Sequence, residues 1–395
     1  MSTTMSVTAS DAVARTRELI PELRERAAQT ALDRRLPQTN VDALRRAGSL
    51  KTIQATRNGG LALGVRSHLD VISALGEGCG STAWVAGVVQ AHSWLLSHFP
   101  EQGQDDVYGA NPDAVVSAVI LPRGKAVRTA DGYRLEGVWP FGSGCERSDW
   151  LLLGAAVFDG DGNAVDQGDF IVPTSEVTLK DDWFVSGLAG TGSCTMVAEG
   201  IDVPAHRFLS MPGLIQGISP GASLHGDDWV VRCAPVPVLT IALCGGAIGI
   251  AKHALADFPS VIKGKVIAYT ADPQEPHPFT HIRLGDAASR IREGELLLYA
   301  VADELDATAQ ANGEVPFLRR AEMRNDCATA VRRLLEGVEI LFRESGATGV
   351  RTASPTNRAL ADIQAINNHG LMKLETNQEM YGRLLLGLDP NTPLI

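Results

Sequence analysis

A run of small residues between two strand-like segments is the first candidate for chemistry. The stretch WPFGSGCERSDW, residues 139–150, places Gly-Ser-Gly-Cys at 142–145, between two tryptophans. Glycine and serine let a backbone approach a flat ligand closely, and their N–H groups can bond its polar edge. Trp139 and Trp150 could offer ring faces to an aromatic ligand. A bulge that turns the sheet would use similar residues, so the stretch leaves ligand binding and simple turning both open.

A second Gly-rich loop, GLAGTGS at 187–193, repeats this composition. Thr191 and Ser193 add hydroxyl groups that can hydrogen-bond a cofactor from a different strand end. A plain hairpin loop uses the same residue types, so this segment also has two interpretations.

Among the histidines, His369 stands in the most distinctive setting. The segment ADIQAINNHGLMKL puts Asn-Asn-His-Gly between two stretches with helical periodicity, which predicts a helix-ending turn. A histidine displayed at such a break can reach a pocket, and its pKa suits proton transfer near neutrality. His92 lies in the apolar helical run VVQAHSWLL, where a hydrogen-bonded core histidine is the ordinary interpretation.

Several kinds of chemistry have no motif in this chain. There is no GxGxxG between a strand and a helix, no GxxxxGK[ST], and no HExxH or Cys/His cluster that would suggest a metal. The six cysteines are scattered without a CxxC pair and are expected to be reduced. Any enzymatic reactivity should therefore come from a bound organic cofactor.

Composition and charge narrow the class of partner. The net charge of −11 argues against nucleic acid or an anionic membrane surface. The uncharged segment 234–251 is long enough to approach a membrane span, but its prolines and Gly-Gly pair favour a buried helix of a bundle. Because the N-terminus lacks an apolar signal segment, a cytoplasmic protein is expected.

The pattern of periodicities predicts an α+β, mainly helical fold. Roughly the first hundred residues have helical periodicity, with an interruption near Gly76–Gly80. The chain changes to period two from Ala114, with a turn predicted at Asp131-Gly132, and helical patterns resume after about Val231. Long helices are predicted at 280–311 and 316–345, followed by two shorter ones at 355–368 and 371–387. Helices, then strands, then helices exclude a doubly wound parallel sheet.

Five segments, in order over most of the chain, resemble one known family. They are RRLP…VDALRRAGS, GCGSTAWV, GVWPFGSGCERSDW, GLAGTGSCTM…IDVP and HGLMKLETNQEMYGRLLLGLDP. Together they resemble the acyl-CoA dehydrogenase fold, and within it the two-component (group D) flavin-dependent monooxygenases that act on 4-hydroxyphenylacetate and steroid-derived phenols. The resemblance implies an N-terminal helical domain (1–113), a central β-barrel-like domain (114–222) and a C-terminal four-helix bundle (223–395) that forms the core of a homotetramer.

The resemblance also implies the cofactor and the partner. Reduced FMN or FAD would come from a separate NAD(P)H:flavin reductase, which suits a chain without a nicotinamide motif. With O2 the flavin would form a C4a-hydroperoxide that oxygenates a small phenol, indole or polyketide-type ring. Such chemistry needs a dry pocket with few polar groups.

Individual roles carry over from the family by position. Ser143 matches the serine that approaches the flavin near N5, and His369 matches the histidine expected to act as acid or base. The other implied contacts are the loop residues Trp139, Phe141, Gly142 and Cys145, the acidic Asp362, and Trp84 and His92, which close over the pocket. Glu146 and Arg147 stand where many aromatic hydroxylases have an Asp-His pair, which makes a substrate other than the usual phenols an open alternative.

Two other functions are compatible with parts of the sequence. A true acyl-CoA dehydrogenase needs a carboxylate base over FAD, for which Glu375 and Glu379 are the candidates near the C-terminus. A scaffold that has lost its flavin would not need the small-residue loop around Ser143. The monooxygenase is therefore the leading prediction.

Overall fold

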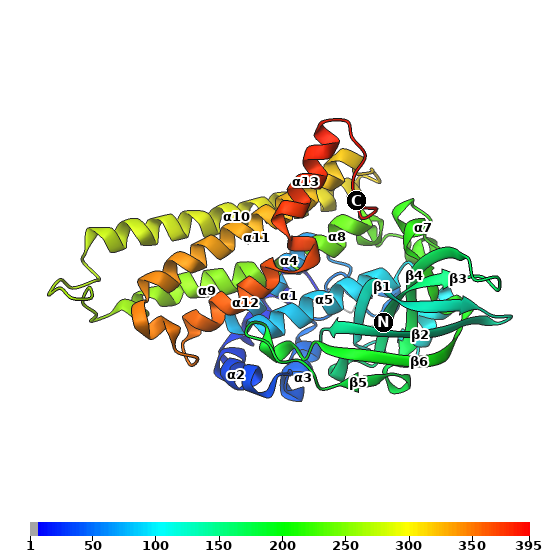
Figure 1. Cartoon of the computed structure of the whole chain (residues 1–395), viewed down its shortest axis with the longest axis horizontal. Coiled ribbons are helices and arrows are strands. Elements are labelled where there is room, and N and C mark those ends of the chain that lie inside the picture. Colours follow the sequence, from blue (N-terminus) through cyan, green and yellow to red (C-terminus); the bar gives the residue numbers. More distant parts are fainter. Residues whose placement is uncertain (1–6) are drawn as a thin grey trace, which may run out of the picture.

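The computed structural model describes residues 7–395 and contains a helical N-terminal part, a central sheet and a helical C-terminal part. Figure 1 shows the sheet at one end of the molecule, the long C-terminal helices extending to the other, and N-terminal helices between them. The N-terminal helices are α1 (Ala9–Arg17), α2 (Ile20–Asp33), α3 (Gln38–Ala47), α4 (Val65–Gly78), α5 (Gly80–Leu96) and α6 (Glu101–Tyr108). The first five follow the predicted helical pattern, whereas α6 was not predicted.

Local sequence explains where these helices begin and how closely they pack. Thr8 and Asp11 form a capping box at the start of α1, because each side chain bonds the backbone N–H of the other. The break between α4 and α5 is the extended residue Cys79, within the predicted 76–80 interruption. Gly76 of α4 lies against Gly249 of the C-terminal part, where a Cβ on Gly249 would overlap the Ser73 carbonyl oxygen. Glycine therefore lets the two helices approach closely.

The central part is one seven-stranded sheet with the order β5-β6-β2-β1-β3-β4-β7. Its strands are β1 (Val116–Arg128), β2 (Gly132–Gly142), β3 (Trp150–Phe158), β4 (Ala164–Pro173), β5 (Thr178–Lys180), β6 (Cys194–Pro204) and β7 (Phe208–Ser210). Only β1 and β3 pair in parallel, and the remaining neighbours are antiparallel. The predicted barrel-like domain is thus formed by one sheet, whose hydrogen-bonded strand order ends at β5 and β7. The hairpin predicted at Asp131-Gly132 joins β1 to β2.

The C-terminal part is built around the long helices α9, α10 and α11. Its helices are α7 (Met211–Ile215), α8 (Pro235–Ile241), α9 (Gly245–Ile262), α10 (Pro278–Gln310), α11 (Phe317–Glu344), α12 (Pro355–Asn367) and α13 (Leu374–Leu385). The two long and two shorter predicted segments correspond to α10–α13 within a few residues at each end. The division of the chain at 113 and 222 stays a prediction.

Within residues 7–395, the stretch Pro235–Ile262 is the one helical segment long and apolar enough to cross a membrane. Its most apolar part is mostly buried in the protein, where α9 packs against α4, α5 and α11. It is therefore a core element, as the sequence predicted. A cytoplasmic location stays a prediction.

Candidate functional site

The two Gly-rich loops that were predicted separately meet at one place. Gly142 pairs with Cys194 where β2 ends and β6 begins, and the Gly144 N–H donates to the Thr191 carbonyl oxygen at 2.9 Å. Beyond the ladder, the Ser143 and Ser193 hydroxyl oxygens are 2.8 Å apart. The pairing of β2 with β6 brings these loops together, although about 50 residues separate them.

Further hydrogen bonds extend from the Ser143–Ser193 contact on both sides. Trp84, on α5, donates its indole N–H to Ser143 Oγ at 3.0 Å. On the other side Ser193 Oγ lies 2.7 Å from Thr191 Oγ1, which donates to the Leu188 carbonyl oxygen at 2.8 Å. Buried side chains thus connect the N-terminal helices to the sheet through hydrogen bonds.

His369 lies against the same tryptophan. It precedes the single-turn helix Gly370–Met372 after α12, and its ring centroid is 5.6 Å from that of Trp84, at an interplanar angle of 61°. The His369 Nδ1 accepts the Leu371 N–H at 3.3 Å, so the neutral ring carries its proton on Nε2. Burial lowers the pKa of His369 to about 4, and the ring is neutral at pH 7.

His92 has the opposite tautomer. Its Nδ1 lies 3.0 Å from the Val116 carbonyl oxygen, which can only accept, so Nδ1 carries the proton and Nε2 has the lone pair. Burial lowers the pKa of His92 to about 4. Ser117, which follows Val116 in β1, donates its hydroxyl proton to the Ser143 carbonyl oxygen at 2.8 Å. His92 is therefore connected to the Ser143 loop through the start of β1.

Asp362, on α12, joins the three parts of the chain. Its carboxylate accepts the Leu188 N–H at 2.6 Å, and its other oxygen lies against Gly80 at the start of α5. Leu188 has a φ of +51°, a left-handed conformation that is unfavourable for leucine and that this hydrogen bond helps to hold. Burial raises the pKa of Asp362 to about 6, although the Leu188 N–H and the Arg358 charge oppose the shift. Asp362 thus holds Leu188 against the start of α5, and its role in the site stays a prediction.

The tryptophans and the cysteine of the first loop pack against other groups of the protein. Trp139 is fully buried in the sheet core, where its indole N–H donates to the Gly154 carbonyl oxygen at 2.7 Å. Cys145 is also fully buried, and the ring of Trp150 is covered by the Arg207 guanidinium. We therefore assign Trp139 and Cys145 to the core, and the geometry does not support a flavin contact for either.

Phe141 differs from its neighbours because it is 65% exposed. Its φ of +71° is unfavourable for an aromatic residue and turns it out of β2. Its ring lies 6.1 Å from that of Trp183, nearly perpendicular to it. Exposed ring surface beside Ser143 suits a flat cofactor. The sequence did not single out Trp183, because DDWFV has the pattern of a strand.

Glu146 and Arg147 hold the loop to the N-terminal helices. Glu146 pairs with Arg35 at 2.8 Å, and Arg147 donates to the Leu36 carbonyl oxygen at 2.9 Å. Glu146 and Arg147, which stand where many hydroxylases have an Asp-His pair, therefore have a structural role in this chain.

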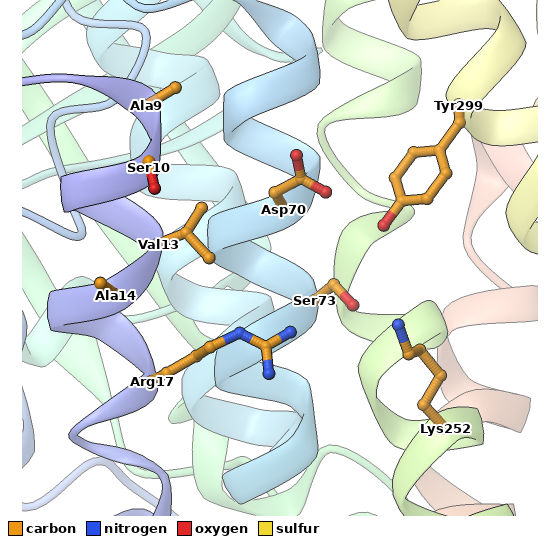
Figure 2. Close-up of a pocket in the computed structure, with 9 residues that line it drawn as sticks. All are labelled: Ala9, Ser10, Val13, Ala14, Arg17, Asp70, Ser73, Lys252 and Tyr299. Carbon is orange, nitrogen blue, oxygen red and sulfur yellow. The ribbon is translucent and has the colours of Figure 1, made fainter.

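A separate cavity of about 370 Å³ lies between α1, α4, α9 and α10, away from this cluster. Figure 2 shows Arg17, Asp70, Lys252 and Tyr299 around it. None of the predicted site residues lines this cavity.

Comparison with known proteins establishes the family. Residues 241–374 match the model of the acyl-CoA dehydrogenase C-terminal domain. The chain is 33% identical over 380 residues to HsaA of Mycobacterium tuberculosis, the oxygenase subunit of a flavin-dependent monooxygenase, with 95% of each chain covered. This chain belongs to the oxygenase components of two-component flavin-dependent monooxygenases. It is therefore a flavin-dependent monooxygenase that uses reduced flavin from a separate reductase.

Further comparisons of sequence and structure cover nearly the whole chain. The FADH2-dependent resorcinol hydroxylase oxygenase component of a Rhizobium species is 32% identical, with 93% of this chain and 92% of the relative covered. The crystal structure of HsaA from Mycobacterium tuberculosis has a TM-score of 0.92 at 31% identity and covers 98% of this chain and 100% of HsaA. XiaF from Streptomyces, in complex with FADH2 and glycerol, has a TM-score of 0.90 at 28% identity, with 98% of this chain and 97% of XiaF covered.

The alternative dehydrogenase chemistry has no suitable base at its predicted positions. The Glu375 side chain is 64% exposed and lies 3.4 Å from Lys373, and Glu379 is also exposed on α13. Neither is placed beside Ser143. The monooxygenase prediction is confirmed, and the dehydrogenase alternative is set aside.

Proposed function

We propose that this oxygenase hydroxylates a small phenolic or heteroaromatic ring at the cluster formed by Trp84, Ser143 and His369. The observation that carries the proposal is the contact of Trp84 with both Ser143 and His369, which brings all three parts of the chain to one site. Relatives are named for resorcinol, p-hydroxyphenylacetate and indole-3-acetate. Each of these names denotes a small aromatic ring, so an aromatic substrate is the natural first class to test.

The residues around Ser143 fit a reduced flavin. Phe141 and Trp183 offer ring surface, and the hydroxyl groups of Ser143, Ser193 and Thr191 provide polar contacts at the loop ends. Bound reduced flavin supplies the electrons that activate O2. We propose FADH2 as the preferred form, because the resorcinol hydroxylase and XiaF are both described with FADH2.

The two histidines would position the substrate in complementary ways. At neutral pH His369 presents an Nε2–H donor and His92 an Nε2 lone pair, since the other nitrogen of each ring is already bonded. A phenol hydroxyl can donate to His92, while His369 can donate to an oxygen atom at the reacting end of the site. Both rings are neutral, so this arrangement avoids placing a fixed charge in an apolar pocket.

We also propose that the chain forms a homotetramer through its C-terminal helices. Large apolar side chains are exposed there, including Phe279 and Ile282 on α10, Phe317 and Leu318 on α11, and Leu385 on α13. Exposed apolar groups concentrated on packed helices are typical of subunit contacts. Light scattering of the purified protein tests the number of subunits.

The catalytic proposal is tested with the purified protein and a flavin reductase that supplies FADH2 or FMNH2. Resorcinol, 4-hydroxyphenylacetate and indole-3-acetate are offered in turn, and oxygenated product is measured against O2 consumed. Product containing one oxygen atom from 18O2 supports the proposal. Oxygen consumption without product from any aromatic ring, including a wider phenol and indole panel, would contradict the substrate class.

A further inference from the structure

The cavity between α1, α4, α9 and α10 has the size of a small-molecule site and lies apart from the cluster at Ser143. Its volume of about 370 Å³ falls within the range of about 300–1,000 Å³ that is typical of ligand pockets. The wall formed by α1 consists mainly of small side chains, which leave the space open: Ala9, Ser10, Val13 and Ala14. These positions follow the spacing i, i+1, i+4 and i+5, so they share one face of the helix.

Polar side chains from all four helices are directed into this cavity. Figure 2 shows the Arg17 guanidinium, the Ser73 hydroxyl and the Lys252 ammonium toward one side of it. The Asp70 carboxylate and the Tyr299 hydroxyl lie toward the other side. The cavity therefore has two cations on one side and a carboxylate on the other.

The two cations are only partly neutralised by their neighbours. Lys252 Nζ lies 3.1 Å from Glu295, but the same carboxylate also pairs with Arg292 at 2.7 Å, so one negative charge faces two positive ones. The Arg17 guanidinium lies 3.9 Å from the Glu77 carboxylate, which is beyond hydrogen-bond distance. An anionic group between Arg17 and Lys252 would therefore meet positive charge and N–H donors.

The Asp70 carboxylate is held from two directions and still has acceptor sites. Arg66 Nε lies 3.3 Å from it, and the Tyr299 hydroxyl donates to it. The Arg66 guanidinium also covers the Tyr299 ring, 3.9 Å from its centroid. Burial and the charge of Asp70 raise the pKa of Tyr299, so its hydroxyl keeps the proton that it donates. Since an ionised carboxylate has about four lone-pair sites, about two remain for a donor such as an ammonium group.

We propose that this cavity binds a small zwitterion, an amino acid whose carboxylate lies between Arg17 and Lys252 and whose ammonium group donates to Asp70. The methylene groups of the ligand lie against the small side chains of α1. The opposite charges of the two sides fix its orientation, because the reversed ligand would place like charges together at both ends. This site is separate from the oxygenation site and does not depend on the substrate proposed there.

Such a ligand would attach α1 more firmly to the rest of the protein. The α1 helix has nine residues, so its stability depends on packing rather than on its own hydrogen bonds. A ligand that joins Arg17 on α1 to Asp70 on α4 and Lys252 on α9 adds contacts between α1 and the core. Bound ligand should therefore slow amide hydrogen exchange in α1.

The test titrates the full chain with 4-aminobutyrate and 6-aminohexanoate by calorimetry. Carboxylic acids and amines of the same chain length, which lack one charged end, are titrated in parallel, together with inorganic phosphate. At least one amino acid should bind about tenfold or more tightly than its matched acid and amine, the effect of one hydrogen bond to a charged group. Equal affinity for amino acid and acid, tighter binding of phosphate, or no saturation by either amino acid would overturn the inference.

Two substitutions test the two ends of the site separately. Arg17→Gln should weaken binding of the amino acid about tenfold and leave that of the matched amine unchanged, whereas Asp70→Asn should remove the preference for the amino acid over the matched acid. Arg15→Gln is the control, because it removes the same charge from an exposed position of α1 that does not line the cavity. Equal losses in Arg17→Gln and Arg15→Gln would overturn the assignment of the carboxylate end.

Hydrogen exchange of the wild-type protein with and without the amino acid locates the ligand. Slower exchange in α1 and α4 supports the inference. Protection confined to α12 and the 187–193 loop would place the ligand at the oxygenation site and overturn it. The Arg17 side chain is 55% exposed, so Arg17→Gln should fold even if Asp70→Asn loosens the packing of α4 on α10.

Discussion

The buried carboxylate of Asp362 gives the most quantitative test of the site's construction. Replacing it by asparagine keeps an oxygen that can accept the Leu188 N–H and removes the negative charge from the junction of α12, α5 and the 187–193 loop. The pKa of Asp362 is raised from 3.8 to about 6 by burial. A carboxyl group with a raised pKa stabilises the fold when protonated and loses that contribution as pH rises through the folded pKa.

The size of the effect follows from that shift. At about 1.4 kcal/mol per pKa unit, the ionised carboxylate costs about 3 kcal/mol relative to its protonated form. About 2 kcal/mol of this loss of stability occurs between pH 4.5 and 7.5. Asp362→Asn has no such titration. The variant should therefore gain about 2 kcal/mol over the wild-type protein across this range, which is on the order of 2–3 °C in melting temperature for a chain of this length.

Thermal unfolding of both proteins at half-unit pH intervals measures this difference. Asp389→Asn, at an exposed position near the C-terminus, is the control and should give a curve parallel to that of the wild-type protein. Parallel curves for Asp362→Asn and the wild-type protein would refute the reasoning, since the carboxylate would then be ionised without cost. A difference that shrinks as pH rises would refute its sign.

Three further substitutions test other contacts of the site. His369→Ala should keep flavin binding but lower the product formed per O2 consumed at least tenfold, and full coupling would count against its role. Trp84→Phe keeps a ring beside His369 but removes the donor to Ser143. It should weaken flavin binding by about 1 kcal/mol in a titration. An unchanged affinity would show that this hydrogen bond does not contribute to flavin binding. Gly187→Ala should push the loop off the Ala361 carbonyl oxygen and destabilise the fold by about 2 kcal/mol or more, which lowers the melting temperature by at least about 2–3 °C. An unchanged melting temperature would contradict the close packing.

Much of the fold follows from local sequence. Apolar periodicity predicted α10–α13 within a few residues, and the Asp131-Gly132 turn predicted the β1–β2 hairpin. These succeeded because helices and hairpins depend on residues close together in the chain. Short elements whose stability comes from packing, such as α6 and β7, have no such signal. A barrel-like central domain was expected from the resemblance, and the order of its seven strands emerges only from the strand pairing.

The sequence by itself also determined which residues could do chemistry: the small-residue loops with Ser143 and Ser193, the turn at His369, and the absence of a nicotinamide motif. Only the tertiary structure decided how they act. It brought Ser143 and Ser193 together through β2–β6 pairing, placed Trp84 between Ser143 and His369, and buried Trp139 in the core. The physical reason is that hydrogen-bond direction and burial depend on partners far away in the chain. Ser143 alone could bond any donor or acceptor, and only the pairing of β2 with β6 and the packing of α5 supply Ser193 and Trp84 as its partners.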